Sequence, residues 1–332
     1  MLPYRSDKLC NMLSRREMLL GVSAAALLRG APMSSKERVD RALKGEDVDR
    51  TPFSFWHHFL DEQKPPESHA KSTLDFHRQF RTDLVKVMSD YPYPKPKGQW
   101  YEARVVDNPF PRQIKALELI RDGLNGEARF VETMFNPWNV ATKLASPEQV
   151  VALKNEKPQR LMDMLEAIAK SEANHARRAI QAGASGIFVS IANAQDGVLA
   201  EADYAKFSEP FDKMVFEAVS SAPLNVLHLH TDAKYRDKLY YRRFLEGWPA
   251  AAINYSMFTY IAIPDIQKTF QGAVMTGLDE RNYRGLTPLD LKREWLAAKQ
   301  AANKKFILTP GCSVPNDSTD DELARLPKLM GA

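Results

Sequence analysis

The sequence predicts an α/β fold, a single (β/α)8 TIM barrel, from three observations. At 332 residues, with 44% hydrophobic and 27% charged, the chain is long enough for one large α/β domain over residues 33–332. From Ser34 onward, short apolar runs alternate with helical periodicity, as in a βα repeat. No Gly-x-Gly-x-x-Gly loop follows the first run, which disfavours a doubly wound sheet, and we expect no nucleotide cofactor.

The first 32 residues are predicted to be a leader or a disordered extension. Ser14–Leu20 contains two consecutive arginines, and the small-residue apolar run Gly21–Leu28 follows, which is typical of a Tat export signal. We therefore expect an exported, periplasmic protein. The alternative is a cytoplasmic protein that starts at Met33, with Ser34 to Glu37 as a capping box. The apolar run is too short for a stable membrane span.

Eight short apolar runs are the predicted strands, and a loop at Pro92–Gly98 is expected to cross the barrel mouth after the second of them. The predicted strands are Pro52–Trp56, Leu84–Met88, Phe130–Met134, Gly186–Ser190, Asn225–His230, Ala251–Asn254, Ala273–Thr276 and Phe306–Leu308. Helical periodicity is clearest in six segments, the second of which has Ser146 as its N-cap and a proline at its first position. These helices are Ser35–Leu43, Pro147–Lys154, Leu161–Gln181, Ala200–Ser220, Lys234–Leu245 and Pro288–Ala302.

Barrel chemistry is expected at the carboxyl ends of the strands. Four of the seven histidines and the one cysteine outside the leader fall there. We predict acid-base or catalytic roles at His57, His58 and Asp90. The predicted substrate-binding residues are Trp56, Tyr91, Trp138, Lys143 and Asn254.

A mixed nitrogen and sulfur site is predicted where the fifth and eighth strands end. His228 and His230 are two residues apart, so both imidazoles leave the same face of a strand while Leu229 points the other way. Together with Cys312, they have the composition of a zinc site with one open position. The eighth strand neighbours the first in a closed barrel, which places His57 or His58 beside Cys312. The alternative is a pair of neutral histidines that contact substrate and a packed cysteine.

Other polar strand ends have two readings each. Asp90 accepts hydrogen bonds from substrate or stabilises developing positive charge, or it caps the next turn. Lys143 meets a substrate carboxylate or is simply solvated. Asp279 and Glu280 supply a metal ligand or a base, or they form an ordinary turn.

The charge pattern limits the partners. The net charge of +4 comes from Lys and Arg that are scattered rather than clustered, which argues against nucleic acid and is compatible with a small anionic substrate. The only cysteines are Cys10 and Cys312, so no disulfide framework exists. A homodimer is the oligomeric state that we consider for this chain.

Five segments together resemble the uroporphyrinogen decarboxylase superfamily, and the likeness covers nearly everything after residue 33. They are Ser34–Trp56, Asp83–Tyr91, Asn136–Leu144, Val274–Glu280 and FILTPGCSVP from Phe306. The resemblance implies a (β/α)8 barrel. The family includes the tetrapyrrole decarboxylase and zinc-dependent methyltransferases that move methyl groups between corrinoid proteins and thiols.

Individual positions separate these two branches. Asp90 matches the aspartate that cradles the pyrrole nitrogens in the decarboxylase. The decarboxylase has an Arg-Gln-Ala-Gly-Arg run where this chain has residues 57–60, and Lys143 replaces its tyrosine. Losing two arginines removes charge-assisted contacts to substrate carboxylates. Cys312 replaces the decarboxylase histidine and matches a zinc thiolate of the methyltransferases, whose His-x-Cys pair corresponds to His228 and His230.

The resemblance therefore implies zinc-assisted, methyltransferase-like chemistry on a tetrapyrrole, corrinoid or other small anionic substrate, with a corrinoid protein as a partner. Replacing one thiolate by an imidazole makes the site less electron-rich. Export disfavours both family chemistries, because haem synthesis and corrinoid methyl transfer are normally cytosolic. The alternatives are uroporphyrinogen III decarboxylation and a barrel that binds a ligand without turnover.

Overall fold

The computed structural model describes residues 32–60, 65–89 and 91–332. Contacts divide the chain into two units, Met1–Met33 and Ser34–Ala332, and the fold given below is that of the second unit. The predicted Tat signal falls on residues 1–31, outside the described residues. Within the described part of the chain, no helix is both long enough and apolar enough to cross a membrane.

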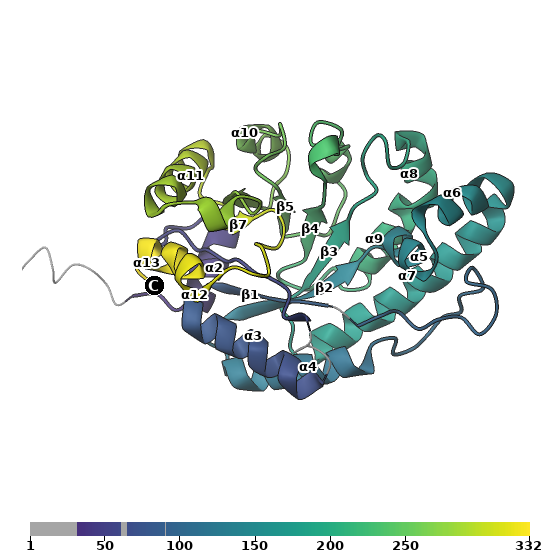
Figure 1. The fold of residues 1–332 in the computed structure, drawn as a ribbon, viewed down its shortest axis with the longest axis horizontal. Helices are drawn as coiled ribbons and strands as arrows, with labels where there is room; N and C mark the ends of the chain where they lie inside the picture. The colour runs from purple at the N-terminus through teal and green to yellow at the C-terminus, as the bar shows by residue number, and fades with distance from the viewer. Residues whose placement is uncertain (1–31, 61–64, 90) are drawn as a thin grey trace, which may run out of the picture. The chain divides into compact units, whose positions relative to one another are not determined.

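Seven parallel strands form one sheet whose spatial order follows the chain order, with helices outside it (Figure 1). Their residues are buried on both faces, as expected for short apolar runs in a parallel sheet. The last seven predicted strands are all present, with small differences at their ends. They are β1 (Leu84–Val87), β2 (Arg129–Phe135), β3 (Ile187–Ile191), β4 (Val226–Leu229), β5 (Ala252–Tyr255), β6 (Ala273–Leu278) and β7 (Phe306–Pro310).

The first predicted strand, Pro52–Trp56, is reduced to a single parallel bridge between Phe53 and Leu308, so the eight-strand count is not met. The segment still lies between β7 and β1. Leu308 N donates to Pro52 O at 2.9 Å, and Asp83 N donates to Phe53 O at 2.8 Å. A longer ladder does not form, because Pro52 has no N–H and Phe53 N donates to the Asp83 carboxylate at 3.0 Å.

Four of the six predicted helices match single helices. Ala200–Ser220 is instead two helices that meet at Ser208, because Pro210 cannot continue the first one. The helix predicted over Lys234–Leu245 is wrong. Leu239 forms an antiparallel bridge with Gln195, so the segment contains only short 3₁₀ turns. The helices are α2 (Ser35–Lys44), α3 (Pro66–Phe80), α4 (Pro111–Leu124), α5 (Pro137–Leu144), α6 (Pro147–Glu156), α7 (Pro158–Gln181), α8 (Glu201–Phe207), α9 (Glu209–Glu217), α10 (Ile263–Gln267), α11 (Pro288–Ala301), α12 (Asp320–Leu323) and α13 (Arg325–Met330).

Helix α2 packs against the sheet, and a buried charge cluster anchors it there. Ser34 caps it by accepting from Glu37 N at 3.1 Å. Val39 and Ala42 are fully buried in the same apolar cluster as residues of all seven strands. Beside them, the Asp83 carboxylate accepts from Arg38 and from Arg50, each at 2.5 Å. One aspartate thus joins α2, the start of β1 and the segment that takes the place of an eighth strand.

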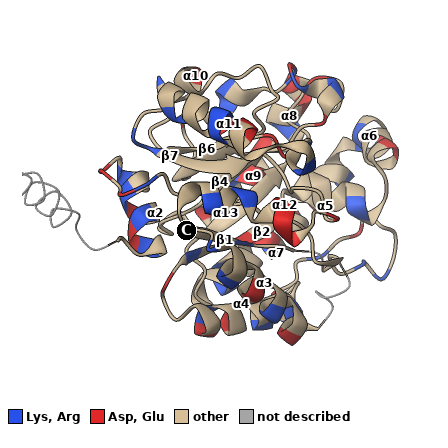
Figure 2. Ribbon diagram, turned by 60° about the vertical axis from the view of Figure 1, so that its left-hand side comes forward, with Lys and Arg blue, Asp and Glu red and all other residues tan. Residues whose placement is uncertain are grey.

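Charged side chains elsewhere are mixed in sign. Figure 2 shows blue and red segments interspersed over the helices of Ser34–Ala332. This agrees with the scattered charges of the sequence, which gave no indication of a nucleic-acid surface.

Replacing Asp83 by alanine is expected to lower the free energy of unfolding by about 3 kcal/mol, because Arg38 and Arg50 would both lose this buried carboxylate, although Arg38 would keep Asp49. Urea unfolding followed by circular dichroism measures this. Asp47→Ala is the matched control, since Asp47 pairs with Lys304 at the surface, and its unfolding midpoint should equal that of the wild type. An equally unchanged midpoint for Asp83→Ala would contradict the anchoring role.

Candidate functional site

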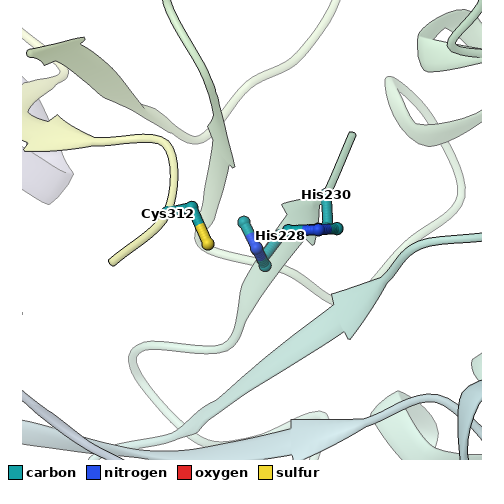
Figure 3. Close-up of side chains that lie close together, drawn as sticks. All are labelled: His228, His230 and Cys312. Carbon is teal, nitrogen blue, oxygen red and sulfur yellow. The ribbon is translucent and has the colours of Figure 1, made fainter. Parts of the chain in front are cut away.

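The carboxyl ends of β4 and β7 bring two imidazoles and a thiol together. His228 is the third residue of β4, and His230 follows directly after the strand. Leu229 between them points to the opposite face and is buried in the outer core, the apolar cluster that it forms with residues of the helices. Cys312 lies on the turn after β7, and Figure 3 shows its sulfur directed toward His228. One ligand atom of each residue lies within 4.8 Å of the other two.

A buried amide fixes the orientation of His228. Asn254 of β5 is the register partner of His228, and its Oδ1 lies 2.7 Å from His228 Nδ1. Its Nδ2 faces the carbonyl oxygens of Met275 and Pro310, each at 2.9 Å. Since carbonyl oxygens only accept, the amide nitrogen must face them, and Oδ1 must accept from His228. Nδ1 therefore carries the proton, and Nε2 keeps the lone pair that binds a metal.

The Glu280 carboxylate fixes the turn that carries Cys312. Gly311 N donates to Glu280 Oε2 at 3.2 Å, and Ser256 Oγ donates to the other oxygen of the same carboxylate. A Cβ at Gly311 would lie 2.1 Å from the Ser256 Cα, so only glycine fits there. Glu280 thus positions the cysteine turn, whereas Asp279 accepts from two backbone N–H groups of the following turn.

The electrostatics differ among the three side chains. Burial holds the pKa of His228 well below its usual value, and the neighbouring His230 lowers it further. Burial also lowers the pKa of His230, but the hydrogen bond and charge of Cys312, together with the nearby Asp232 and Glu280 carboxylates, raise the pKa overall. For Cys312, burial raises the pKa, and the His230 contact lowers it below the usual value. A neutral imidazole and a thiol that readily ionises are the forms that bind zinc, so these residues fit the metal.

A cavity of about 320 Å³ opens onto the three side chains. Lys86 of β1, which sequence reasoning missed, lines it. Its ammonium lies 5.2 Å from the Trp56 ring centroid and 4.8 Å from that of Phe188. The sequence feature that could have indicated Lys86 is a lysine inside an otherwise apolar strand. The cavity lining is Trp56, His58, Lys86, Met88, Ser89, Thr133, Phe135, Asn139, Thr142, Lys143, Phe188, Ser190, Ala192, His228, His230, Cys312 and Ser313.

Not all of the predicted site residues reach this cavity. Trp56, His58 and Lys143 line it, and Tyr91 lines a neighbouring one. Of the other four candidates, three are placed elsewhere and one falls outside the described residues. The His57 ring packs on Phe59 and Phe76, Trp138 is buried in the outer core, Asn254 lies behind His228, and Asp90 lies outside the described residues.

Comparisons with known proteins agree with this architecture. A family profile described as uroporphyrinogen decarboxylase (URO-D) matches residues 99–330. No curated protein sequence matches the chain significantly. Among solved structures, a methyltransferase from Methanosarcina mazei is 17% identical with a TM-score of 0.70, covering 90% of this chain and 98% of that one. A B12-independent methionine synthase from Shewanella sp. is 9% identical with a TM-score of 0.57, covering 85% and 92%.

At these identities, the similarity to solved structures shows a shared fold and nothing more. The family match carries more weight, because residues 99–330 are well over half of the chain. The chain belongs to the uroporphyrinogen decarboxylase family.

Proposed function

We propose that this protein is a zinc-dependent, methyltransferase-type enzyme in which His228, His230 and Cys312 hold the metal. The observation that carries the proposal is the convergence of their three ligand atoms within 4.8 Å, beside a cavity. The orientation of His228 by Asn254 supports it, because metal-binding imidazoles usually donate their other N–H to a fixed acceptor. Three ligands leave the fourth position of a tetrahedral site for substrate.

When bound, zinc would supply a Lewis acid that lowers the pKa of a substrate thiol. The residues of the chain favour the same outcome. Two neutral imidazoles and one thiolate leave a divalent site with net positive charge, and the Lys86 ammonium adds to it. The Trp56 and Phe188 rings make the wall beside Lys86 apolar, which strengthens these electrostatic interactions. The cavity therefore favours an anionic sulfur over a neutral thiol.

In the reaction that we propose, the thiolate sulfur forms a bond with the methyl carbon of a methylcorrinoid. The cobalt–carbon bond breaks, and its electron pair stays on cobalt. The proton of the thiol leaves before the transfer, and the products are a methyl thioether and a reduced corrinoid. The corrinoid is delivered by a partner protein or as a free small molecule.

Metal analysis of protein purified without chelators is expected to find about one zinc per chain. His228→Ala and Cys312→Ala should each lose it, because two ligands are too few for a stable site. His57→Ala is the matched control, since this histidine packs on aromatic rings and is not in the cluster. Unchanged zinc in both ligand variants would overturn the assignment, and so would its loss in His57→Ala.

Asn254→Ala is expected to weaken zinc binding by about 10- to 100-fold, because it frees the tautomer and ring orientation of His228. Competition with a chromophoric chelator measures the affinity. Asn225→Ala is the control: this buried asparagine also bonds to backbone, at the opposite end of the same strands. It should destabilise the fold without changing zinc affinity. Equal zinc affinity in the two variants would show that Asn254 has no positioning role.

Incubation of the zinc-loaded protein with methylcobalamin and a thiol is expected to yield a methyl thioether. Cys312→Ala should reduce the rate at least about a hundredfold, since it removes the one thiolate of the site. Mass spectrometry follows the product, and visible absorbance follows the corrinoid. Tight corrinoid binding with no thioether would instead support a non-catalytic barrel, and decarboxylation of uroporphyrinogen III would support the other family branch.

A further inference from the structure

A second cavity, of about 280 Å³, adjoins the candidate zinc cavity. Four residues line both of them, so the two share a wall: Ser89, Thr133, Phe135 and Lys143. The rest of the lining comes from β2, α5, α7 and the loop after β1. None of its polar groups has a role in the metal site. The second cavity is therefore placed to hold a further part of a substrate.

Aromatic rings form part of the wall of the second cavity. Tyr93 and Phe110 pack edge to face with ring centroids 6.0 Å apart, and Phe135 also lines the cavity. A cavity of about 150 Å³ suffices for benzene in a protein core. The second cavity is nearly twice as large, so it can hold a ring with a polar substituent.

Glu172 of α7 gives this cavity an unusual polar group. Its side chain is 1% exposed, it lines the cavity, and no described residue donates a hydrogen bond to it. A buried carboxylate without donors is costly, so the neutral acid is favoured. Burial, together with the nearby Glu132 carboxylate, raises the pKa of Glu172 to about 8. At neutral pH, the group is therefore a hydrogen-bond donor.

Further donors surround the same space. The Thr133 hydroxyl is buried and has no hydrogen-bond partner among the described residues, which is uncommon for a native side chain. Lys143 and Lys95 add two ammonium groups, and the Lys143 charge acts on Glu172. A set of donors with two positive charges matches the acceptor oxygens of an organic anion.

We propose that the second cavity is a substrate subsite for a small aromatic carboxylate, whose ring packs on Tyr93, Phe110 and Phe135. Its carboxylate oxygens accept hydrogen bonds from Glu172 and Thr133 and face the Lys143 ammonium. The shared wall would place the far end of such a ligand beside the zinc site. The part of this ligand in methyl transfer rests on the proposed function, whereas its binding does not.

Isothermal titration of the full chain with benzoate tests the subsite, with benzamide as the uncharged isostere. Benzoate is expected to bind at least tenfold more tightly than benzamide, because only the anion pairs with the ammonium groups. The same preference is expected in His228→Ala, so a failed zinc assignment would leave this result intact. Equal affinity for the two probes, or no benzoate binding, would overturn the subsite.

The pH dependence tests the role of Glu172. Above its pKa the carboxylate repels benzoate, so affinity is expected to fall about tenfold from pH 7 to pH 9. Glu172→Gln keeps an N–H donor and cannot ionise, and its benzoate affinity should not change over this range. A fall of equal size in Glu172→Gln would exclude Glu172 as the cause. The other titratable groups that face Glu172 or line the cavity are Glu132, His175, Lys143, Lys95, Tyr91 and Tyr93.

Thr133→Val supplies a second test that does not depend on pH. Because the hydroxyl is unpartnered without ligand, its removal should leave the melting temperature unchanged or higher. Benzoate affinity should nevertheless fall several-fold. A lower melting temperature with unchanged benzoate affinity would show that the hydroxyl supports the fold and contacts no ligand.

Discussion

The Asn254 amide is the constraint on which the candidate site depends. It lies on β5, accepts from His228 on β4, and bonds to backbone of β6 and β7 through a single nitrogen. Its side chain is fully buried, so an unsatisfied amide there would cost free energy. The register of four strands and the tautomer of one imidazole are therefore set by the same group. A shift of β4 by one residue would separate His228 from both its acceptor and Cys312.

The two ends of the sheet differ in how their buried polar groups are paired. At one end, Asp83 joins α2 and the Phe53 segment to β1 through buried ion pairs. At the carboxyl ends of the strands, buried polar groups are not fully paired within the protein. The Thr133 hydroxyl and Nδ1 of His175 have no partner among the described residues. Unpaired groups of this kind cost stability, and such a cost is expected where a ligand completes the hydrogen bonds.

Much of the architecture follows from the sequence, because apolar runs and helical periods report which residues are buried. The spacing of His228 and His230 placed both imidazoles on one face of a strand, and the Pro310-Gly311 turn placed Cys312 nearby. The Phe53 segment could not be predicted as a single bridge, since the capture of its N–H by Asp83 is a tertiary contact.

The site residues that were missed have a similar physical origin. Lys86 and Glu172 occupy apolar faces of a strand and a helix, where a sequence pattern shows burial but not what lies opposite. His57 and His58 are adjacent in sequence, and only the packing of Phe59 and Phe76 decides that His57 turns away. Sequence periodicity predicts on which face of a strand or helix a side chain lies. The cavity that the side chain lines depends on the other elements packed against that face.

X-ray absorption at the zinc edge of the purified protein identifies the ligands of the metal. We predict a four-coordinate zinc with one sulfur at about 2.3 Å, two imidazole nitrogens at about 2.0–2.1 Å and one further light-atom ligand. The sulfur contribution should be absent in Cys312→Ala. A zinc shell without sulfur in the unmodified protein, or one that Cys312→Ala leaves unchanged, would show that Cys312 is not a zinc ligand.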